Sequence, residues 1–127
     1  MKISAAEAEV MAVVWTRAEA GGARADEILA EAGAASGWSD STARTLIHRL
    51  IRKGALVAER RGGRVIYRPL LAREDWTLQE SQGLLDRLFG GQVAGLVAHF
   101  AKTRGLTGEE VARLRRLVAE LDAEAED

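Results

Sequence analysis

The stretch that decides the fold is residues 38–54, which read WSDSTARTLIHRLIRKG. Ser39 or Asp40 can accept a hydrogen bond from a backbone amide at a helix start, and Gly54 after two basic residues is typical of a helix end. Between these signals the apolar residues recur at three- and four-residue intervals, which is the period of one helix face. We therefore predict a helix over residues 40–53 whose buried stripe consists of Leu46, Ile47, Leu50 and Ile51.

The opposite face of this helix carries side chains that can all donate hydrogen bonds. From Ser41 to Lys53 there is no carboxylate, although an ordinary exposed helix usually presents both signs of charge. An α-helix fits the major groove of B-DNA, where Arg pairs with guanine and hydroxyl or imidazole groups reach base edges or phosphates. Arg49 adjoins the apolar stripe and could bind a phosphate or an internal carboxylate. The predicted groove-facing residues are Ser41, Arg44, Thr45, His48 and Arg52, at i, i+3, i+4, i+7 and i+11.

Two further helices are predicted upstream of this segment. Residues 4–7, SAAE, form a capping box, in which a hydroxyl and a carboxylate satisfy backbone amides at a helix start. The helix that follows should end near Gly21 and Gly22. A second, short helix fits residues 25–32, and Gly33 is expected to stop it.

Downstream of the helix the sequence changes to the period of a hairpin. Residues 56–61 and 64–68 read as two strands joined by two glycines, and Pro69 ends the second strand. Three helices followed by a hairpin is the order of a winged helix-turn-helix. The basic hairpin tip suits contact with the DNA backbone or the minor groove, and its candidate residues are Arg60, Arg61 and Arg64.

Charge is distributed unevenly along the chain. The whole protein has a net charge of -1, but residues 41–68 hold eight basic residues against one acidic residue, a balance of +7. A local basic block in a near-neutral protein is typical of a polyanion partner, although it can also be a solvated face. Because the block coincides with the predicted helix and hairpin, we interpret it as a DNA-binding surface.

From Glu74 the chain returns to helical periodicity. Residues 77–80 and 107–110 match two more capping boxes. These Leu- and Val-rich helices are too short to enclose a thick core, so they pack either on a second copy of the chain, which we favour, or on the N-terminal domain. The expected fold is mainly α with a small antiparallel β wing: a winged helix-turn-helix DNA-binding domain at residues 1–73 and a helical dimerisation domain at residues 74–127. The predicted dimer contacts are Leu85, Leu88, Phe89, Val93, Leu96, Val97, Phe100, Val111, Leu114, Val118 and Leu121.

The composition argues against several other classes of protein. The chain has no Cys, and His48 and His99 lack the spacing of paired ligands, so we expect no metal and no cofactor. Phosphate-binding loops and hydrolase or zinc-peptidase motifs are absent, so we expect no enzyme. No apolar run approaches the roughly 20 residues that span a bilayer, and the N-terminus has no signal-peptide core, which indicates a cytoplasmic protein without membrane insertion. The residues interpreted as packing residues are Trp15, Trp38 and Trp76.

Residues 37–56 resemble the recognition-helix signature of the penicillinase repressor (BlaI/MecI) family. Residues 6–11 with Trp15, residues 63–67 and residues 73–75 resemble the same family. The resemblance implies a homodimer whose two winged domains bind an inverted-repeat operator in double-stranded DNA and repress nearby bacterial genes. It also implies groove-reading roles for Ser41, Thr42, Arg44, Thr45 and His48.

The resemblance also bears on how repression ends. In the family, a membrane sensor peptidase pathway leads to cleavage of an Asn-Phe bond in the dimerisation region. The pair that matches it here is His99-Phe100, so the cleavage mechanism and its link to β-lactams do not carry over by residue identity. A repressor gated by a small-molecule ligand, and a winged helix used only for protein–protein contact, are the alternative functions.

Overall fold

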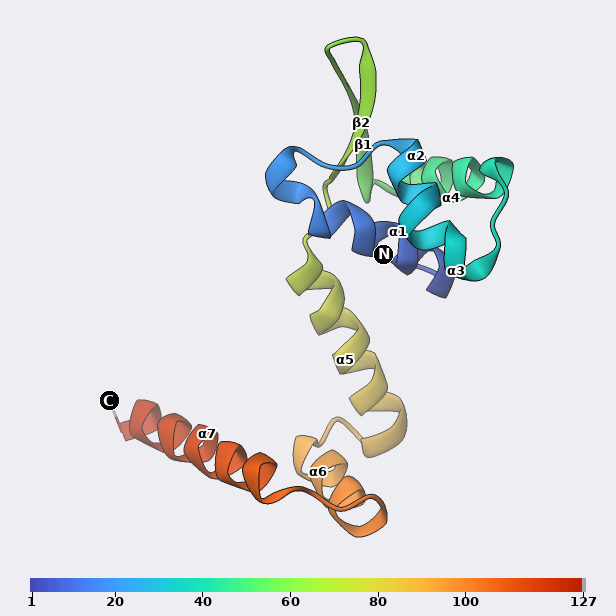
Figure 1. Ribbon diagram of the computed structural model, residues 1–127. Coiled ribbons are helices and arrows are strands. Elements are labelled where there is room, and N and C mark those ends of the chain that lie inside the picture. The colour runs from blue at the N-terminus through green and yellow to red at the C-terminus, as the bar shows by residue number, and fades with distance from the viewer. Residues whose placement is uncertain (127) are drawn as a thin grey trace. The chain divides into compact units, whose positions relative to one another are not determined.

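The computed structural model describes residues 1–126, which are mostly helical, with one two-stranded antiparallel sheet (Figure 1). The chain divides into two compact units, Met1–Leu78 and the residues from Gln79 onward. The helix α5 (Arg73–Phe89) contributes to both units. Within residues 1–126, each helix is too short or too polar to span a lipid bilayer.

The first unit has the helix and strand order predicted for a winged helix-turn-helix. Its three main helical segments group beside the hairpin in Figure 1. Ser39 caps the third of them, because its Oγ accepts a hydrogen bond from Thr42 N at 3.1 Å. The elements are α1 (Ala5–Thr16), the 3-10 turn η1 (Ala18–Ala20), α2 (Ala25–Ile28), the π-helical turn η2 (Leu29–Gly33), α3 (Ala34–Ser36), α4 (Asp40–Lys53), β1 (Leu56–Arg61) and β2 (Arg64–Pro69).

The predicted end of the second helical segment is wrong. The segment continues through η2 and α3 to Ser36, because Gly33 has a right-handed φ of -76° and Gly37 is the residue with a left-handed φ of +67°. Packing explains the glycine at position 33. A Cβ there would lie 3.0 Å from Leu29 Cδ1 and 3.3 Å from Trp38 Cβ, so the position needs a small residue although the helix does not stop.

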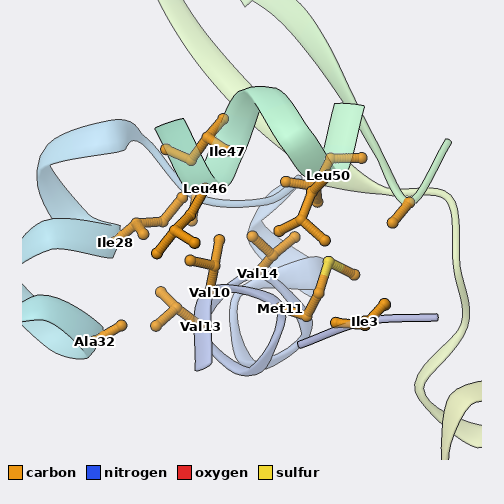
Figure 2. Packing of buried hydrophobic residues seen from close by; sticks show 13 residues of the cluster. Ile3, Val10, Met11, Val13, Val14, Ile28, Ala32, Leu46, Ile47 and Leu50 are labelled. Carbon is orange, nitrogen blue, oxygen red and sulfur yellow. The ribbon is translucent and has the colours of Figure 1, made fainter. Parts of the chain in front are cut away.

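The core of this unit lies between α1, the α2–α3 segment and α4 (Figure 2). Val10 and Val14 of α1 face Leu46 and Leu50 of α4, and Ile28 closes the cluster from α2. All of these side chains are buried. The buried stripe predicted for α4 is therefore confirmed at Leu46, Ile47 and Leu50, while Ile51 is only partly buried at its edge. This packing fixes which face of α4 points outward.

The wing is a regular hairpin attached to the helical core at its base. Leu56 pairs with Pro69 and Arg61 with Arg64, so the two glycines occupy the turn as predicted. At the base, Ala23 and Tyr67 exchange two backbone hydrogen bonds of 3.0 and 2.8 Å. This isolated bridge joins β2 to the segment before α2 and sets the position of the wing relative to α4.

Gly22→Ala should weaken this attachment. Gly22 has a φ of +128°, and a Cβ added there would overlap the backbone carbonyl of Tyr67. Forcing a residue other than glycine into such a backbone region costs on the order of 1–3 kcal/mol, and the overlap adds to that cost. We therefore expect the free energy of unfolding, measured with urea, to fall by at least about 2 kcal/mol. Gly37→Ala is the control, because φ is also positive there but the added Cβ meets nothing within 4 Å. An equal loss in the two variants would contradict the overlap.

The tryptophans pack as predicted, and two of them connect the start of α5 to the core of the first unit. The rings of Trp15 and Trp76 pack at a tilt of 40° with their centroids 5.5 Å apart, and Arg73 Cζ lies 5.7 Å from the centroid of the Trp15 ring. Trp15 Nε1 also donates a hydrogen bond to the Leu71 carbonyl at 2.9 Å. Trp38 packs against the same core. The beginning of α5 is therefore part of the first unit.

The second unit contains the rest of α5, α6 (Val93–Thr103) and α7 (Gly108–Glu126). The capping box predicted at Thr107 is confirmed by reciprocal hydrogen bonds with Glu110 of 3.1 and 3.2 Å. The one predicted at Thr77 is wrong, because Thr77 lies inside α5 and its hydroxyl donates to the Arg73 carbonyl at 2.8 Å. Helix α5 begins at Arg73, next to the expected start at Glu74, and its first turns carry Trp76 against Trp15.

Candidate nucleic-acid interface

The outer face of α4 is the candidate surface for contact with DNA. The residues on its inner side are buried, whereas every predicted groove-facing side chain is exposed. The helix ends at Gly54, whose left-handed φ of +82° turns the chain into β1. The exposed predicted residues of α4 are Ser41, Thr42, Arg44, Thr45, His48, Arg49 and Arg52.

A concavity of about 900 Å³ lies between the start of α2, the outer face of α4 and the wing strand β2. It brings three predicted residues together, Arg44 and His48 of α4 and Arg64 of the wing. Two charged residues that the sequence did not single out for DNA contact, Arg24 and Asp40, line the same space. The sequence does hold a hint of each. Arg24 stands directly before a predicted helix start, and Asp40 stands four positions before Arg44, where an acidic residue can pair with an arginine.

Two of the hydroxyl groups on this face already make local hydrogen bonds. Thr45 Oγ1 donates to the Ser41 carbonyl at 3.0 Å, within the helix. Thr42 Oγ1 lies 3.0 Å from Ser39 Oγ, next to the capping bond. A hydroxyl that donates within the helix still has lone pairs, so Thr45 could accept from a base amino group. Thr42 is placed beside the helix cap rather than in the middle of the outer face.

The carboxyl end of α4 is tied to the N-terminus of the protein. Lys53 Nζ donates to Glu7 Oε1 at 2.7 Å and to the Lys2 carbonyl at 2.9 Å. Glu7 is buried and also accepts a hydrogen bond from Ser4 N. Burial raises the pKa of the Glu7 carboxyl, but hydrogen bonds with Lys53 and Ser4 outweigh it, so the pKa lies below its ordinary value of 4.5. The contacts of Lys53 with Glu7 and with the Lys2 carbonyl form a clamp, which fixes the outer face of α4 relative to α1.

Lys53→Met should destabilise the first unit, because Glu7 would keep a buried charge without its partner. We expect the free energy of unfolding, measured with urea at pH 7, to fall by about 1–2 kcal/mol, which is the contribution of a hydrogen bond to a partly exposed charged group. Since the folded-state pKa of Glu7 is lowered, the stabilisation is present above the unfolded value near 4.5 and is lost as the pH falls through the folded value. The difference between variant and parent should therefore shrink below pH 4.5. Lys2→Met is the control, because only its backbone takes part.

The clamp also bears on Arg49. The internal carboxylate at this end of the helix, Glu7, is bound by Lys53, and Arg49 is exposed. This arrangement favours the phosphate interpretation of Arg49 over the internal one.

The wing presents its basic residues in two different states. Arg68 and Arg61 are paired with the Glu59 carboxylate. The hydrogen bond from Arg68 lowers the pKa of the Glu59 carboxyl below its ordinary value, and Arg61 contributes a smaller part of this lowering. Arg60 and Arg64 are exposed toward solvent near the turn. The tip therefore offers Arg60 and Arg64 most directly to a phosphate backbone, while Arg61 is partly engaged by Glu59.

The second unit has no buried side chain in α5, α6 or the described part of α7. A groove of about 330 Å³ between α6 and α7 is lined by Leu96, Val97, Phe100 and Leu114. The His99 ring lies 5.7 Å from the rings of both Phe89 and Phe100. Among the predicted dimer contacts, the most exposed are Leu88, Val93, Phe100, Val118 and Leu121, and those partly buried are Leu85, Phe89, Leu96, Val97, Val111 and Leu114.

Comparison with known proteins places this arrangement in a family. The sequence profile of the penicillinase repressor family matches residues 3–120. The chain is 33% identical to a penicillinase repressor of Bacillus licheniformis over 119 residues, which covers 94% of this chain and 91% of that protein. It is 30% identical to the methicillin resistance regulatory protein MecI of Staphylococcus aureus strain N315, covering 92% of this chain and 93% of that protein.

A solved structure is similar to part of this chain. It is the solution structure of the monomeric form of Bacillus licheniformis BlaI in complex with the blaP half-operator. The similarity has a TM-score of 0.51 and a sequence identity of 36%, and it covers 59% of this chain and 88% of that chain. The winged helix-turn-helix predicted from the sequence is therefore confirmed.

Proposed function

Since this chain belongs to the penicillinase repressor family, we propose that it represses transcription by binding a specific operator in double-stranded DNA as a homodimer. The observation that carries the proposal is the outer face of α4, which is exposed and free of carboxylates from Ser41 to Lys53. Members of the family are transcriptional regulators, so the prediction that the chain is not an enzyme is confirmed. As a bacterial repressor it would act in the cytoplasm, where the chromosome lies.

In the proposed complex, α4 enters the major groove. Arg44 and His48 face the base edges from the second and third turns, and Arg49 and Arg52 bind phosphates at the groove rim. The wing lies along the flanking backbone, where Arg60 and Arg64 contact phosphates or the minor groove. The similarity of this chain, over 59% of its length, to a repressor bound to a half-operator supports this placement.

The unburied apolar side chains of the second unit support dimerisation through this unit. Val118 and Leu121 are more than half exposed in the single chain, on a helix whose apolar residues recur with a near-heptad spacing. A second copy would bury them, and a closed dimer has twofold symmetry. Two recognition helices about 34 Å apart would then enter successive major grooves of an inverted repeat. One relative binds a half-operator in its monomeric form, and this observation supports an operator for the present chain that consists of two half-sites.

The dimer interface is then the natural control point, because two linked half-sites bind far more tightly than one. A sensor peptidase pathway of the kind found in the family would have to act at His99-Phe100, which lies exposed on α6. Without the Asn of the family motif, cleavage there would need a peptidase of different specificity.

The experiment that tests the proposal is selection of tightly bound duplexes from a randomised library, followed by affinity measurements over a range of salt concentrations. We expect an inverted repeat with half-site centres one helical turn apart, and a log-log salt slope of roughly -0.9 per phosphate neutralised. Random duplex should bind at least about 1,000-fold more weakly. Equal binding of selected and random DNA would reject operator recognition and favour a protein partner for the basic face.

A further inference from the structure

The first turn of α4 contains a carboxylate, that of Asp40, which suits the positive end of the helix dipole but makes no capping hydrogen bond. Asp40 begins the helix, but the capping hydrogen bond goes to Ser39, whose Oγ accepts from Thr42 N at 3.1 Å. The Asp40 side chain is 65% exposed and lines the concavity between α2, α4 and β2. A carboxylate in this position repels the phosphates of a bound duplex. Asp40 therefore opposes the attraction of the basic face around it.

Asp40 is paired with the residue that is predicted to read bases. Its Oδ2 lies 2.9 Å from Arg44 Nε, one turn further along the helix. The contact engages Nε and leaves the two terminal amino groups of the guanidinium, which are the groups that can pair side by side with O6 and N7 of guanine. A long side chain loses conformational entropy when it binds DNA. Because the contact with Asp40 already restricts the Arg44 side chain, less entropy is lost when Arg44 binds a base in the orientation that this contact allows.

We propose that Asp40 is a specificity-determining residue of the DNA interface: it positions Arg44 for guanine and penalises duplexes that offer no matching base. The inference rests on the proposed operator binding. On a non-matching sequence Arg44 turns to a phosphate, and Asp40 is left unpaired beside the polyanion. On a matching sequence Arg44 keeps its contact with Asp40 while it binds guanine, and the second carboxylate oxygen can accept from a cytosine amino group. The repulsion is offset only at the matching site.

The test compares Asp40→Asn, Asp40→Glu and the control Asp26→Asn in the full-length protein. Asp26 lines the same concavity and carries the same charge, but it belongs to α2 and pairs with Arg24 at 3.2 Å. The preferred duplex is first selected with the parent protein. Dissociation constants are then measured for that duplex, for its single-base-pair variants and for random duplex, and thermal melting checks that each variant is folded.

Asp40→Asn should bind random duplex about tenfold more tightly, because the repulsion between the carboxylate and the phosphates is removed. It should also lose about tenfold discrimination at one base pair, because a bidentate base contact contributes roughly 5- to 150-fold. Asp40→Glu keeps the charge and can still reach Arg44, so it should retain most of the discrimination. Asp26→Asn should leave the base-pair profile unchanged. Unaltered discrimination by Asp40→Asn, or the same loss in Asp26→Asn, would overturn the role of Asp40. If the parent protein itself does not separate the selected duplex from random DNA, the proposed function fails instead.

Discussion

Val118→Asp combined with Leu121→Asp should reduce operator affinity by about 100- to 10,000-fold, the avidity that a linked second half-site supplies. Both side chains are more than half exposed on α7, so the substitutions remove little packing within one chain and place two charges in the proposed dimer interface. Binding to a duplex with a single half-site should stay nearly unchanged. Sedimentation of the protein alone should show a monomer where the parent sediments as a dimer.

The matched control is Ala119→Asp combined with Ala123→Asp. It adds the same charge to the same helix, but on the side away from the stripe of Val111, Leu114, Val118 and Leu121. This variant should remain a dimer with the affinity of the parent. If both double variants lose operator affinity equally, added charge explains the loss and α7 is not the interface. If neither becomes monomeric, dimerisation uses another surface.

Arg44→Ala should lower operator affinity by about 1–3 kcal/mol, which corresponds to roughly 5- to 150-fold, and should weaken discrimination at one base pair. The residue is 66% exposed and lies in the concavity shared with the wing. A phosphate contact would behave differently, because its removal weakens binding to all sequences alike and reduces the salt slope by about one. Titrations against the selected duplex, its single-base-pair variants and random DNA distinguish the two.

Arg113→Ala is the control for this substitution. Arg113 is also an exposed arginine whose guanidinium faces a carboxylate four residues earlier, Glu109, but it lies on α7 outside the DNA-binding unit. It should leave both affinity and base preference unchanged. A selected duplex that binds Arg44→Ala as tightly as the parent would contradict the assignment of α4 as the recognition helix.

Helix α4 and the hairpin could be predicted with correct bounds because their signals are local. Ser39 and Gly54 bracket α4, and Gly62 and Gly63 sit in the turn that the strand register requires. Local signals misled where a residue serves packing instead. Gly33 is small because Leu29 and Trp38 lie close to it, and it does not end a helix.

The charged pairs show the same division. An acidic residue four positions before an arginine is visible in the sequence, so the contact of Asp40 with Arg44 could have been anticipated. The contact of Lys53 with Glu7 could not, because 46 residues separate the two and only the packing of α1 against α4 brings them together. The same packing favours the phosphate interpretation of Arg49, because it pairs Glu7 with Lys53 instead.

The amino-acid sequence alone determined the class of fold, the inner and outer faces of α4 and the basic surface of the first unit, because helix period, caps and turn glycines act between near neighbours. Only the tertiary structure decided that Arg24, Asp40, Arg44 and Arg64 line one concavity and that Ala23 is joined to Tyr67. These groups come from segments far apart in the chain, and their distances depend on how buried side chains of three helices pack, which no local pattern encodes.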